Sequence, residues 1–220
     1  SLNNCRVDHE KFKVIFYMYM SDLECDYDEL FDQIKDNKYY SLFLQKVLKD
    51  KPFTVNMINH MIKMDKKYFD YFIDCHGNTP LIFICSESMN ELALNFIDKY
   101  GEDCKPDHVD DFGNTALIWA CKNGLYEVAL KLIDTYGELC KPEHVDDDGI
   151  TALFWTCKYY EYDNDNNFDV DYYYTKNRMN NLALKLIDTF GEKCKPDYID
   201  DDDNTALILY CKNGMNEVCL

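Results

Sequence analysis

The residues in this sequence best suited to metal chemistry are cysteines and histidines that recur at a fixed spacing. The pattern C-x-x-x-H occurs twice, as Cys104 with His108 and as Cys140 with His144. Ligand pairs can have this spacing, but a tetrahedral zinc site needs four convergent ligands. A third copy of the pattern has Tyr198 in place of the histidine and therefore lacks a ligand. We interpret the pattern as a product of repeat duplication, and we expect no metal ion and no other cofactor.

A second pattern that could bind a metal lies in the acidic, tyrosine-rich segment 161–177. Alternate residues with side-chain oxygens there resemble the opening of a calcium loop: Asp163, Asp165, Asn167 and Asp169. Such a loop needs glycine at its sixth position and a bidentate glutamate at its twelfth, where this sequence has Phe168 and Tyr174. We therefore predict a flexible loop without helical periodicity. A calcium site is the alternative, and micromolar binding in a calorimetric calcium titration would support it.

Nothing in the remaining sequence forms a recognisable catalytic set. No catalytic Ser-His-Asp or Cys-His arrangement stands out, and there is no glycine-rich phosphate loop and no recognisable pair of catalytic carboxylates. We therefore predict a protein that is not an enzyme and has no catalytic or cofactor-binding residues. An enzymatic role would need a catalytic domain outside these residues.

The net charge of −18 limits the class of partner. Lysine and arginine supply most of the affinity of proteins for nucleic-acid phosphates, so we predict no nucleic-acid partner. A protein with a basic surface fits this charge better. The alternative is that the acidic residues only solvate the surface.

Signals for membranes and for secretion are also missing from the sequence. The longest apolar stretch near its start, residues 14–20, is far too short to span a bilayer, and no cleavage site follows a basic N-region. The chain has eleven cysteines, an odd number, and several of them recur in the same register. We interpret them as small buried thiols in a reducing compartment. We therefore predict an intracellular, cytoplasmic protein without a membrane partner, and we expect a monomer.

The element that must position any functional residue is an internal repeat. The string NTALIWACKNG at 114–124 returns at 204–214 as NTALILYCKNG, and weaker copies begin at Asn78 and Ile150. The threonines that mark the copies lie 36, 36 and 54 residues apart. A fixed period of this size predicts a stack of repeated units, each of which buries its apolar face against its neighbours.

The copy at 110–145 shows what one unit contains. Its turn cluster places Gly113 where a positive φ is needed, and Thr115 offers a side-chain oxygen at a helix start. Helical spacing of apolar residues then predicts a short helix at 116–122 and an antiparallel helix at 126–136. The unit is therefore a turn, a helix, a tight turn, a second helix and a loop.

The repeated pattern D-x-x-G-x-T-[PA]-L, followed by paired helices, resembles the ankyrin repeat. The residues that carry the resemblance are Asp74, Gly77, Thr79, Pro80 and Leu81 in one copy, Asp110, Gly113, Thr115 and Leu117 in the next, and Asp146, Gly149, Thr151 and Leu153 in the third. The resemblance covers residues 74–220 and implies an all-α, ankyrin-type solenoid of stacked antiparallel helix pairs with turn tips.

The sequence departs from the ankyrin pattern in three respects. The family's frequent histidine after the T-P-L triplet is replaced by Ile82, Ile118, Phe154 and Ile208, so apolar packing must replace a Thr–His hydrogen bond. The period is 36 residues rather than about 33. Asp203 stands where the turn glycine belongs, and an aspartate can adopt the left-handed conformation there at a cost.

On this basis the chain divides into a cap and a series of repeats. The predicted parts are 1–37 as a helical N-terminal cap, 38–73 as a degenerate ankyrin repeat, 74–109 and 110–145 as ankyrin repeats, 146–199 as an ankyrin repeat with an insertion at about 161–177, and 200–220 as a truncated ankyrin repeat. One predicted helix in 38–73 carries its apolar face on Val55, Ile58, Met61 and Ile62. A separate functional domain at 1–73 is the alternative. Because the final helix stops after one turn, we expect the natural chain to continue with more repeats.

In the ankyrin family, the turn tips and the exposed side of the first helix line a concave face that binds protein partners. By position, that face would comprise Asp111, Phe112, Asn114, Trp119, Lys122, Asn123, Asp147, Asp148, Ile150, Trp155, Lys158, Tyr159, Asp201, Asp202 and Asn204. Acidic tips beside aromatic side chains would suit a basic segment with apolar anchors. The alternatives are inter-repeat packing for the two tryptophans and turn chemistry for the aspartates.

The resemblance implies a non-enzymatic module that binds a protein partner on this face. The alternative is an adaptor whose repeats recruit a substrate while a segment outside this chain engages a ubiquitin ligase or other machinery. Frequent Asn, Asp, Lys, Ile and Tyr fit an AT-rich genome, and the diverged repeats resemble the ankyrin proteins of giant and pox-like DNA viruses. A viral protein of this kind would bind a host protein in the host cytoplasm. A protist origin fits the composition as well.

Overall fold

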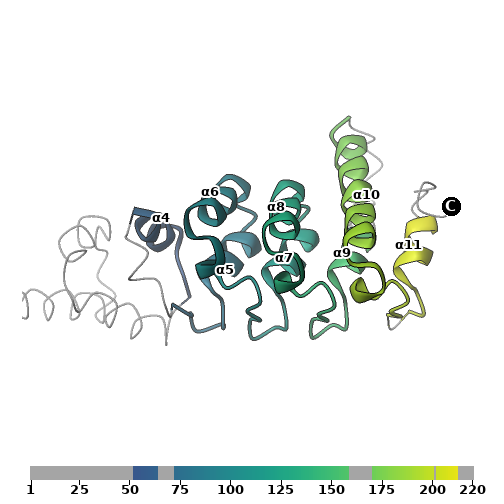
Figure 1. Cartoon of the computed structure of the whole chain (residues 1–220), viewed down its shortest axis with the longest axis horizontal. Coiled ribbons are helices and arrows are strands. Elements are labelled where there is room, and N and C mark those ends of the chain that lie inside the picture. The colour runs from purple at the N-terminus through teal and green to yellow at the C-terminus, as the bar shows by residue number, and fades with distance from the viewer. Residues whose placement is uncertain (1–51, 64–71, 159–169, 201, 213–220) are drawn as a thin grey trace, which may run out of the picture. The chain divides into compact units, whose positions relative to one another are not determined.

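The structure is a computed structural model that describes residues 52–63, 72–158, 170–200 and 202–212 (Figure 1). The chain divides into two compact units, residues 1–75 and residues 76–220. The predicted cap at 1–37 lies outside the described residues, as does most of the predicted degenerate repeat at 38–73.

The described part of the first unit contains helix α4, Val55–Lys63. Ile58 and Met61 are fully buried, which agrees with the predicted apolar face. Ile62 is only partly buried, and Val55, at the start of the helix, is 41% exposed. The buried face of α4 is therefore narrower than we predicted.

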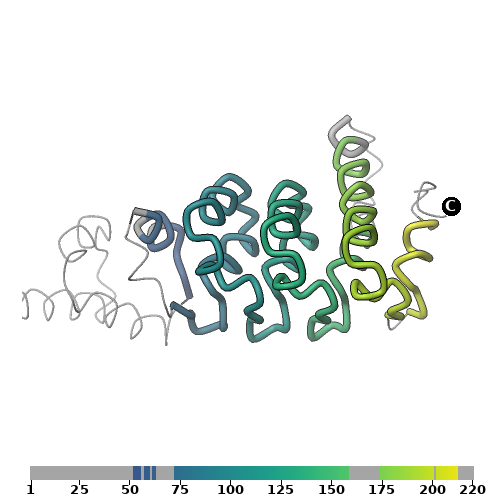
Figure 2. The backbone as a smooth tube through the Cα atoms, viewed as in Figure 1, coloured from purple at the N-terminus to yellow at the C-terminus, as the bar shows by residue number. Residues whose placement is uncertain are grey.

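The described part of the second unit is a stack of helix pairs. Short first helices alternate with longer second helices: α5 Pro80–Ser86, α6 Asn90–Tyr100, α7 Ala116–Lys122, α8 Tyr126–Tyr136, α9 Ala152–Lys158, α10 Val170–Phe190 and α11 Ala206–Lys212. The first helices form one row and the second helices form another (Figure 1 and Figure 2). A short 3-10 helix follows each second helix, at Gly101–Cys104, Gly137–Cys140 and Gly191–Cys194. Two isolated bridges are the only β pairing among the described residues, and the predicted all-α solenoid is confirmed.

Local sequence explains where the first helices begin. The Thr115 hydroxyl accepts a hydrogen bond from the Ile118 N–H at 3.1 Å, with the extended backbone angles of a cap, φ −90° and ψ 168°. The threonines before α5, α9 and α11 make the same contact. Such a cap satisfies one of the N–H groups that a helix start leaves without an intrahelical partner. The predicted bounds of α7 and α8, residues 116–122 and 126–136, are confirmed.

Apolar side chains occupy the place of the ankyrin histidine. Ile82, Ile118 and Phe154 are fully buried, which confirms apolar packing there in three repeats. Burying a side chain of this size stabilises the stack by roughly 1.5–3 kcal/mol. Ile208 lies in α11, the last described helix, and is 41% exposed, so the prediction is wrong at that position.

The cysteines of the first helices also differ between the last described helix and the earlier ones. Cys85, Cys121 and Cys157 are buried in α5, α7 and α9. Burial raises the pKa of all three thiols, that of Cys157 to about 12. None of the cysteines in the described part of the chain forms a disulfide. The equivalent Cys211 in α11 is exposed, so a buried thiol was the wrong prediction there.

Helix α10 corrects the prediction for the insertion. It begins at Val170, inside the segment 161–177 that we predicted to be a flexible loop without helical periodicity. That prediction is wrong for residues 170–177. The calcium-like residues at 163–169 lie outside the described residues.

The extension of α10 has two physical causes. Its C-terminal half is anchored by fully buried side chains such as Leu182 and Leu186, and a nucleated helix lengthens at little further cost. Arg178 then holds the preceding turn, because its guanidinium lies 5.0 Å from the Tyr174 ring and 4.7 Å from the Tyr126 ring of α8. Despite this length, none of the described helices combines the length and apolar composition needed to cross a bilayer.

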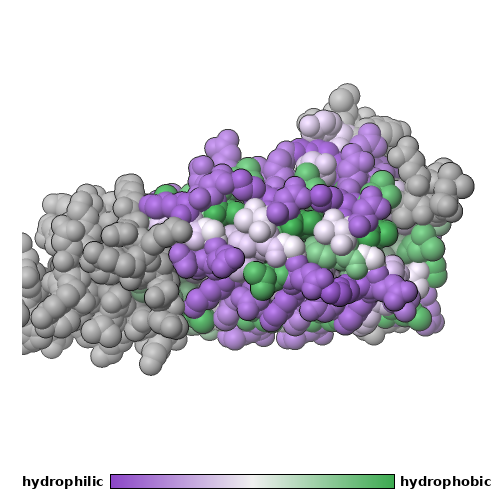
Figure 3. Space-filling view, viewed as in Figure 1, coloured by the Kyte–Doolittle hydropathy of each residue, from purple (hydrophilic) through white to green (hydrophobic). Residues whose placement is uncertain are grey.

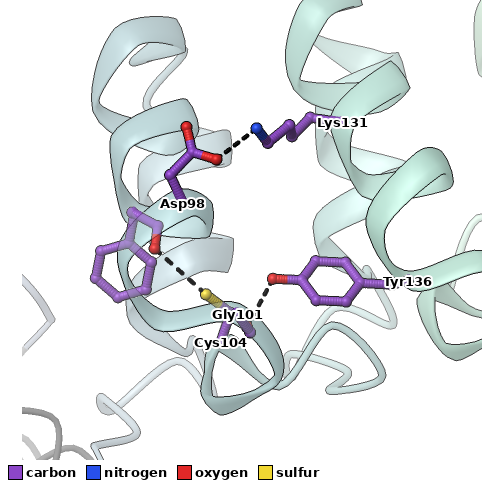
Figure 4. Close-up of polar contacts among 6 residues, drawn as sticks. Asp98, Gly101, Cys104, Lys131 and Tyr136 are labelled. Atoms are coloured by element: carbon purple, nitrogen blue, oxygen red, sulfur yellow. Dashed lines mark hydrogen bonds and ion pairs between the residues drawn. The ribbon is translucent and has the colours of Figure 1, made fainter.

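In the described part of the chain, three ion pairs join the second helices of neighbouring repeats, and a fourth joins the 3-10 helices that follow α8 and α10. An acidic side chain in one repeat contacts a cation in the next: Asp98 with Lys131, Glu127 with Arg178, Asp134 with Lys185, and Glu138 with Lys193. Figure 4 shows the first pair beside Tyr136, whose hydroxyl donates to the Gly101 carbonyl at 2.6 Å. We call these four pairs the ion-pair row. They connect α6 to α8, and α8 with its following 3-10 helix to the next repeat.

Candidate partner-binding surface

The turn tips are organised by the first aspartate of each repeat. Oδ1 of Asp110 accepts hydrogen bonds from the N–H groups of Phe112 and Asn114, at 2.9 and 2.7 Å. Oδ1 of Asp146 accepts from the Ile150 N–H at 2.7 Å. A short carboxylate that binds its own backbone in this way stabilises a tight turn. These turn contacts are made by Asp110 and Asp146, which were not among the aspartates of the predicted face.

Successive tips touch through their backbones. The Asp147 N–H donates to the Phe112 carbonyl of the preceding repeat at 3.2 Å. Gly113 has a φ of +76°, and a Cβ added to it would lie 2.7 Å from the Asp147 nitrogen. Both the backbone angle and the close approach therefore require glycine. At the last tip, Asp203 adopts the left-handed conformation with φ 59°, as we predicted for that aspartate.

The two histidines of the C-x-x-x-H pattern bind the tips. A carbonyl oxygen only accepts, so Nε2 of His108 donates to the Gly77 carbonyl at 2.8 Å and Nε2 of His144 donates to the Gly113 carbonyl at 3.0 Å. The cysteines four residues earlier are buried and donate to backbone carbonyls of their own repeats. Within the described residues, no three His, Cys, Asp or Glu side chains gather as a metal site would require. The sequence did not predict these histidine–carbonyl contacts. The recurrence of the histidine at the same repeat position was the signal that could have indicated them.

Asp110 and Asp146 also orient two indole rings. Oδ2 of Asp110 accepts a hydrogen bond from Nε1 of Trp119 at 2.7 Å, and Oδ2 of Asp146 accepts one from Nε1 of Trp155 at 2.9 Å. Both carboxylates are 95% buried, and these bonds satisfy them within the protein. In the sequence, these two aspartates stood out only as markers of the repeat pattern. Their equal spacing to a tryptophan nine residues later was the signal for this second role.

A lysine lies between the two indole rings. Nζ of Lys122 is 5.0 Å from the centroid of Trp119 and 4.4 Å from that of Trp155 in the next repeat. Nζ of Lys158 lies 5.8 Å from Trp155. The faces of aromatic rings attract cations at such distances. We call Trp119, Lys122 and Trp155 the indole site.

The predicted partner-binding residues differ in their exposure. The exposed ones are Asp111, Phe112, Asp147, Asp148 and Asp202, and the partly exposed ones are Trp119, Lys122, Asn123 and Lys158. The buried ones are Asn114, Ile150, Trp155 and Asn204. Tyr159 and Asp201 lie outside the described residues. Burial leaves Asn114, Ile150 and Asn204 little surface for a partner to contact, whereas one face of the Trp155 ring lies under the side chain of Lys122.

The side chain of Asn123 acts within the stack. Its Nδ2 donates to the carbonyls of Cys85 and Ser86, at 2.9 and 3.0 Å. These carbonyls belong to the C-terminal end of α5, where a helix leaves acceptors without intrahelical partners. Asn123 therefore caps the first helix of the preceding repeat.

The exposed aspartates at the tips have no cationic partner. Among the described residues, no ion pair forms with Asp111, Asp147, Asp148 or Asp202. At the last tip, burial works to raise the pKa of Asp200, but hydrogen bonds from Asn204 and from the Asp202 N–H hold that pKa below its usual range. Hydrophilic residues cover most of the visible face of the described repeats in Figure 3. The tips therefore carry exposed carboxylates that form no ion pair with any other described residue.

Comparisons with known proteins agree with this architecture. Residues 54–139 match the family model described as ankyrin repeats (3 copies). A crystal structure of an ankyrin repeat domain from Acinetobacter baumannii AYE is 17% identical, has a TM-score of 0.57 and is matched over 93% of each chain. The ankyrin repeat protein EF0377 is 15% identical, with a TM-score of 0.52 over 84% of this chain and 92% of that one. No curated protein sequence matches the chain.

Proposed function

Because the chain has the fold of ankyrin repeat domains, which are generally protein–protein interaction modules, we propose that it binds a basic segment of a protein partner on its tips. The tip face consists of the exposed side chains of Asp111, Phe112, Asp147, Asp148 and Asp202. The observation that carries the proposal is that none of these aspartates has an ion-pair partner among the described residues. In this proposal the protein acts by binding and is not an enzyme.

Electrostatics favour a basic partner at the tip face. Aspartates of neighbouring repeats lie within a row, so their fields add over distances of about 10 Å, the screening length at 0.1 M salt. Phe112 is 54% exposed within this row and lies 6.3 Å from the His76 ring. An exposed aromatic side chain among charges can anchor an apolar residue of the partner.

The repeat spacing suggests the form of the partner. Neighbouring helices pack about 8–10 Å apart, and an extended chain rises about 3.3 Å per residue. About three residues of an extended partner would therefore cross each repeat. A basic residue at every third position would then meet one tip after another.

A binding experiment tests this proposal. A labelled peptide with lysine at every third position should bind the full chain in fluorescence anisotropy, with an affinity that falls as salt rises. The double change Asp147→Asn and Asp148→Asn should weaken binding about tenfold, because it removes two carboxylates from the tip face. A matched control, Asp134→Asn with Glu138→Gln, removes two carboxylates from the ion-pair row. Equal losses in both variants would contradict a specific role for the tips.

Two narrower roles extend the proposal. As an adaptor, the module would recruit a substrate while a segment outside this chain engages a ubiquitin ligase or other machinery. As a viral protein, it would act as a monomer in the host cytoplasm on a host factor, and the composition and diverged repeats support such an origin. The complete reading frame tests the first role, since it must encode the engaging segment. Its genomic source tests the second.

A further inference from the structure

We infer that the indole site receives one lysine or arginine side chain of the partner, and that Lys122 occupies the site until the partner binds. The partner's cation would replace Lys122 on the two indole rings, and Lys122 would move to the side chain of Asn114. The inference rests on the proposed function, because it assumes a basic partner. It adds a specific contact to the general attraction of the tip face.

The indole site is built to hold a cation. Lys122 lies within 5.0 Å of both ring centroids, and the rings come from two different repeats. Asp110 and Asp146 accept hydrogen bonds from the two indole N–H groups and so fix the orientation of the rings. Carboxylates bound at the ring edges also strengthen the attraction of the ring faces for a positive charge. Another ammonium or guanidinium group would be held in the same way.

A second position is ready for Lys122. Oδ1 of Asn114 is buried and accepts no hydrogen bond from any of the described residues, although buried acceptors are normally satisfied. In the last repeat, Oδ1 of Asn204 accepts a hydrogen bond from Nζ of Lys212 at 2.5 Å. Lys212 follows Asn204 by eight residues, and Lys122 follows Asn114 by the same eight. The pair in α11 thus shows the position that Lys122 can take in α7.

The same comparison selects Lys122 among the lysines of the first helices. Lys158 also lies over Trp155, but Ile150 stands where the acceptor asparagine would be needed. Lys158 therefore has no equivalent position to move to. Lys122 can leave the indole rings and satisfy a buried acceptor in the same movement. The exchange then has a small net cost, since one favourable contact of Lys122 replaces another.

Tryptophan fluorescence can test the exchange directly. The chain has two tryptophans, and both belong to the indole site, so their emission reports on that site alone. Titration of the full chain with the lysine-rich peptide, without a label, should change the emission with the midpoint seen in anisotropy. Lys122→Met keeps an apolar stem but removes the competing ammonium group, and it should bind the peptide about fivefold more tightly.

The control is Lys185→Met, which makes the same charge change in the ion-pair row and should alter the affinity less than about twofold. Urea unfolding of both variants checks that they are folded. If the peptide binds with no change in emission, or if both variants bind alike, the inference is wrong and the proposed function stands. If the peptide binds neither the original chain nor Lys122→Met, the inference and the proposed function fail together.

Discussion

The tip face and the ion-pair row both place carboxylates on successive repeats, yet only one of them neutralises these charges. In the ion-pair row, Asp134 reaches Lys185, a residue at a different position of the next repeat. At the tips, the Asp147 N–H binds the carbonyl of Phe112, the residue after its own equivalent Asp111, so like charges fall on neighbouring tips. Equivalent positions of successive repeats therefore carry charges of the same sign. In the ion-pair row, these charges are neutralised by contacts with residues at different positions of the next repeat. Ion pairs thus join the second helices between repeats, whereas the exposed tip carboxylates form none among the described residues.

The largest expected effect tests whether the tips form a rigid edge. Gly113→Ala should lower the free energy of unfolding by about 3 kcal/mol, because the added Cβ requires a strained φ and meets the backbone of Asp147. Gly149→Ala has a similar φ, +73°, but its Cβ would meet only the Tyr198 hydroxyl. That side chain can move, so the loss should be about 1 kcal/mol. Urea unfolding measures both, and equal losses would show that the contact between tips is unimportant.

An intermediate effect compares a threonine beside the tips with one on a second helix. Thr115→Ala removes the buried cap of α7 and should lower the free energy of unfolding by about 1–2 kcal/mol. Thr135→Ala changes an exposed position of α8 and should alter it by less than about 0.5 kcal/mol. Thermal unfolding of the two variants gives the difference. If Thr135→Ala lowered the free energy of unfolding more than Thr115→Ala, the threonine cap would not be the more important of the two for stability.

The smallest expected effect on stability compares a carboxylate of the ion-pair row with a carboxylate of the tip face. Asp134→Asn breaks an exposed ion pair with Lys185 and should lower the free energy of unfolding by about 0.5 kcal/mol at low salt. Asp147→Asn should cause no loss, and relief of repulsion from Asp111 can even raise the stability slightly. Unfolding in low and high salt separates the two, because screening should remove both effects. A clear loss for Asp147→Asn would mean that the tip carboxylate is already satisfied within the protein.

Much of the fold could be predicted because it depends on neighbouring residues. The bounds of α7 and α8 and the role of Thr115 follow from a cap, an apolar period and a terminating glycine within a few residues of each other. The full burial of Ile118 in place of a histidine was predictable for the same reason. These features recur in each copy, so each copy supported the others.

The candidate site was less predictable because its contacts cross between repeats. The placement of His108 against Gly77 joins residues that lie 31 positions apart. The helical start of α10 depends on Arg178, which contacts Tyr126 of the preceding repeat, and the tyrosine-rich sequence shows no apolar period there. The sequence left two positions open for Trp155, an exposed face and inter-repeat packing, and its burial favours the second.

By itself, the sequence determined the repeat, the start and end of each short helix, and the acidic character of the turns, since these depend on residue type and local spacing. The tertiary structure decided which carboxylates are neutralised and where Lys122 lies. Both depend on how far a side chain reaches into the next repeat, a distance set by the packing of helices and absent from the order of residues.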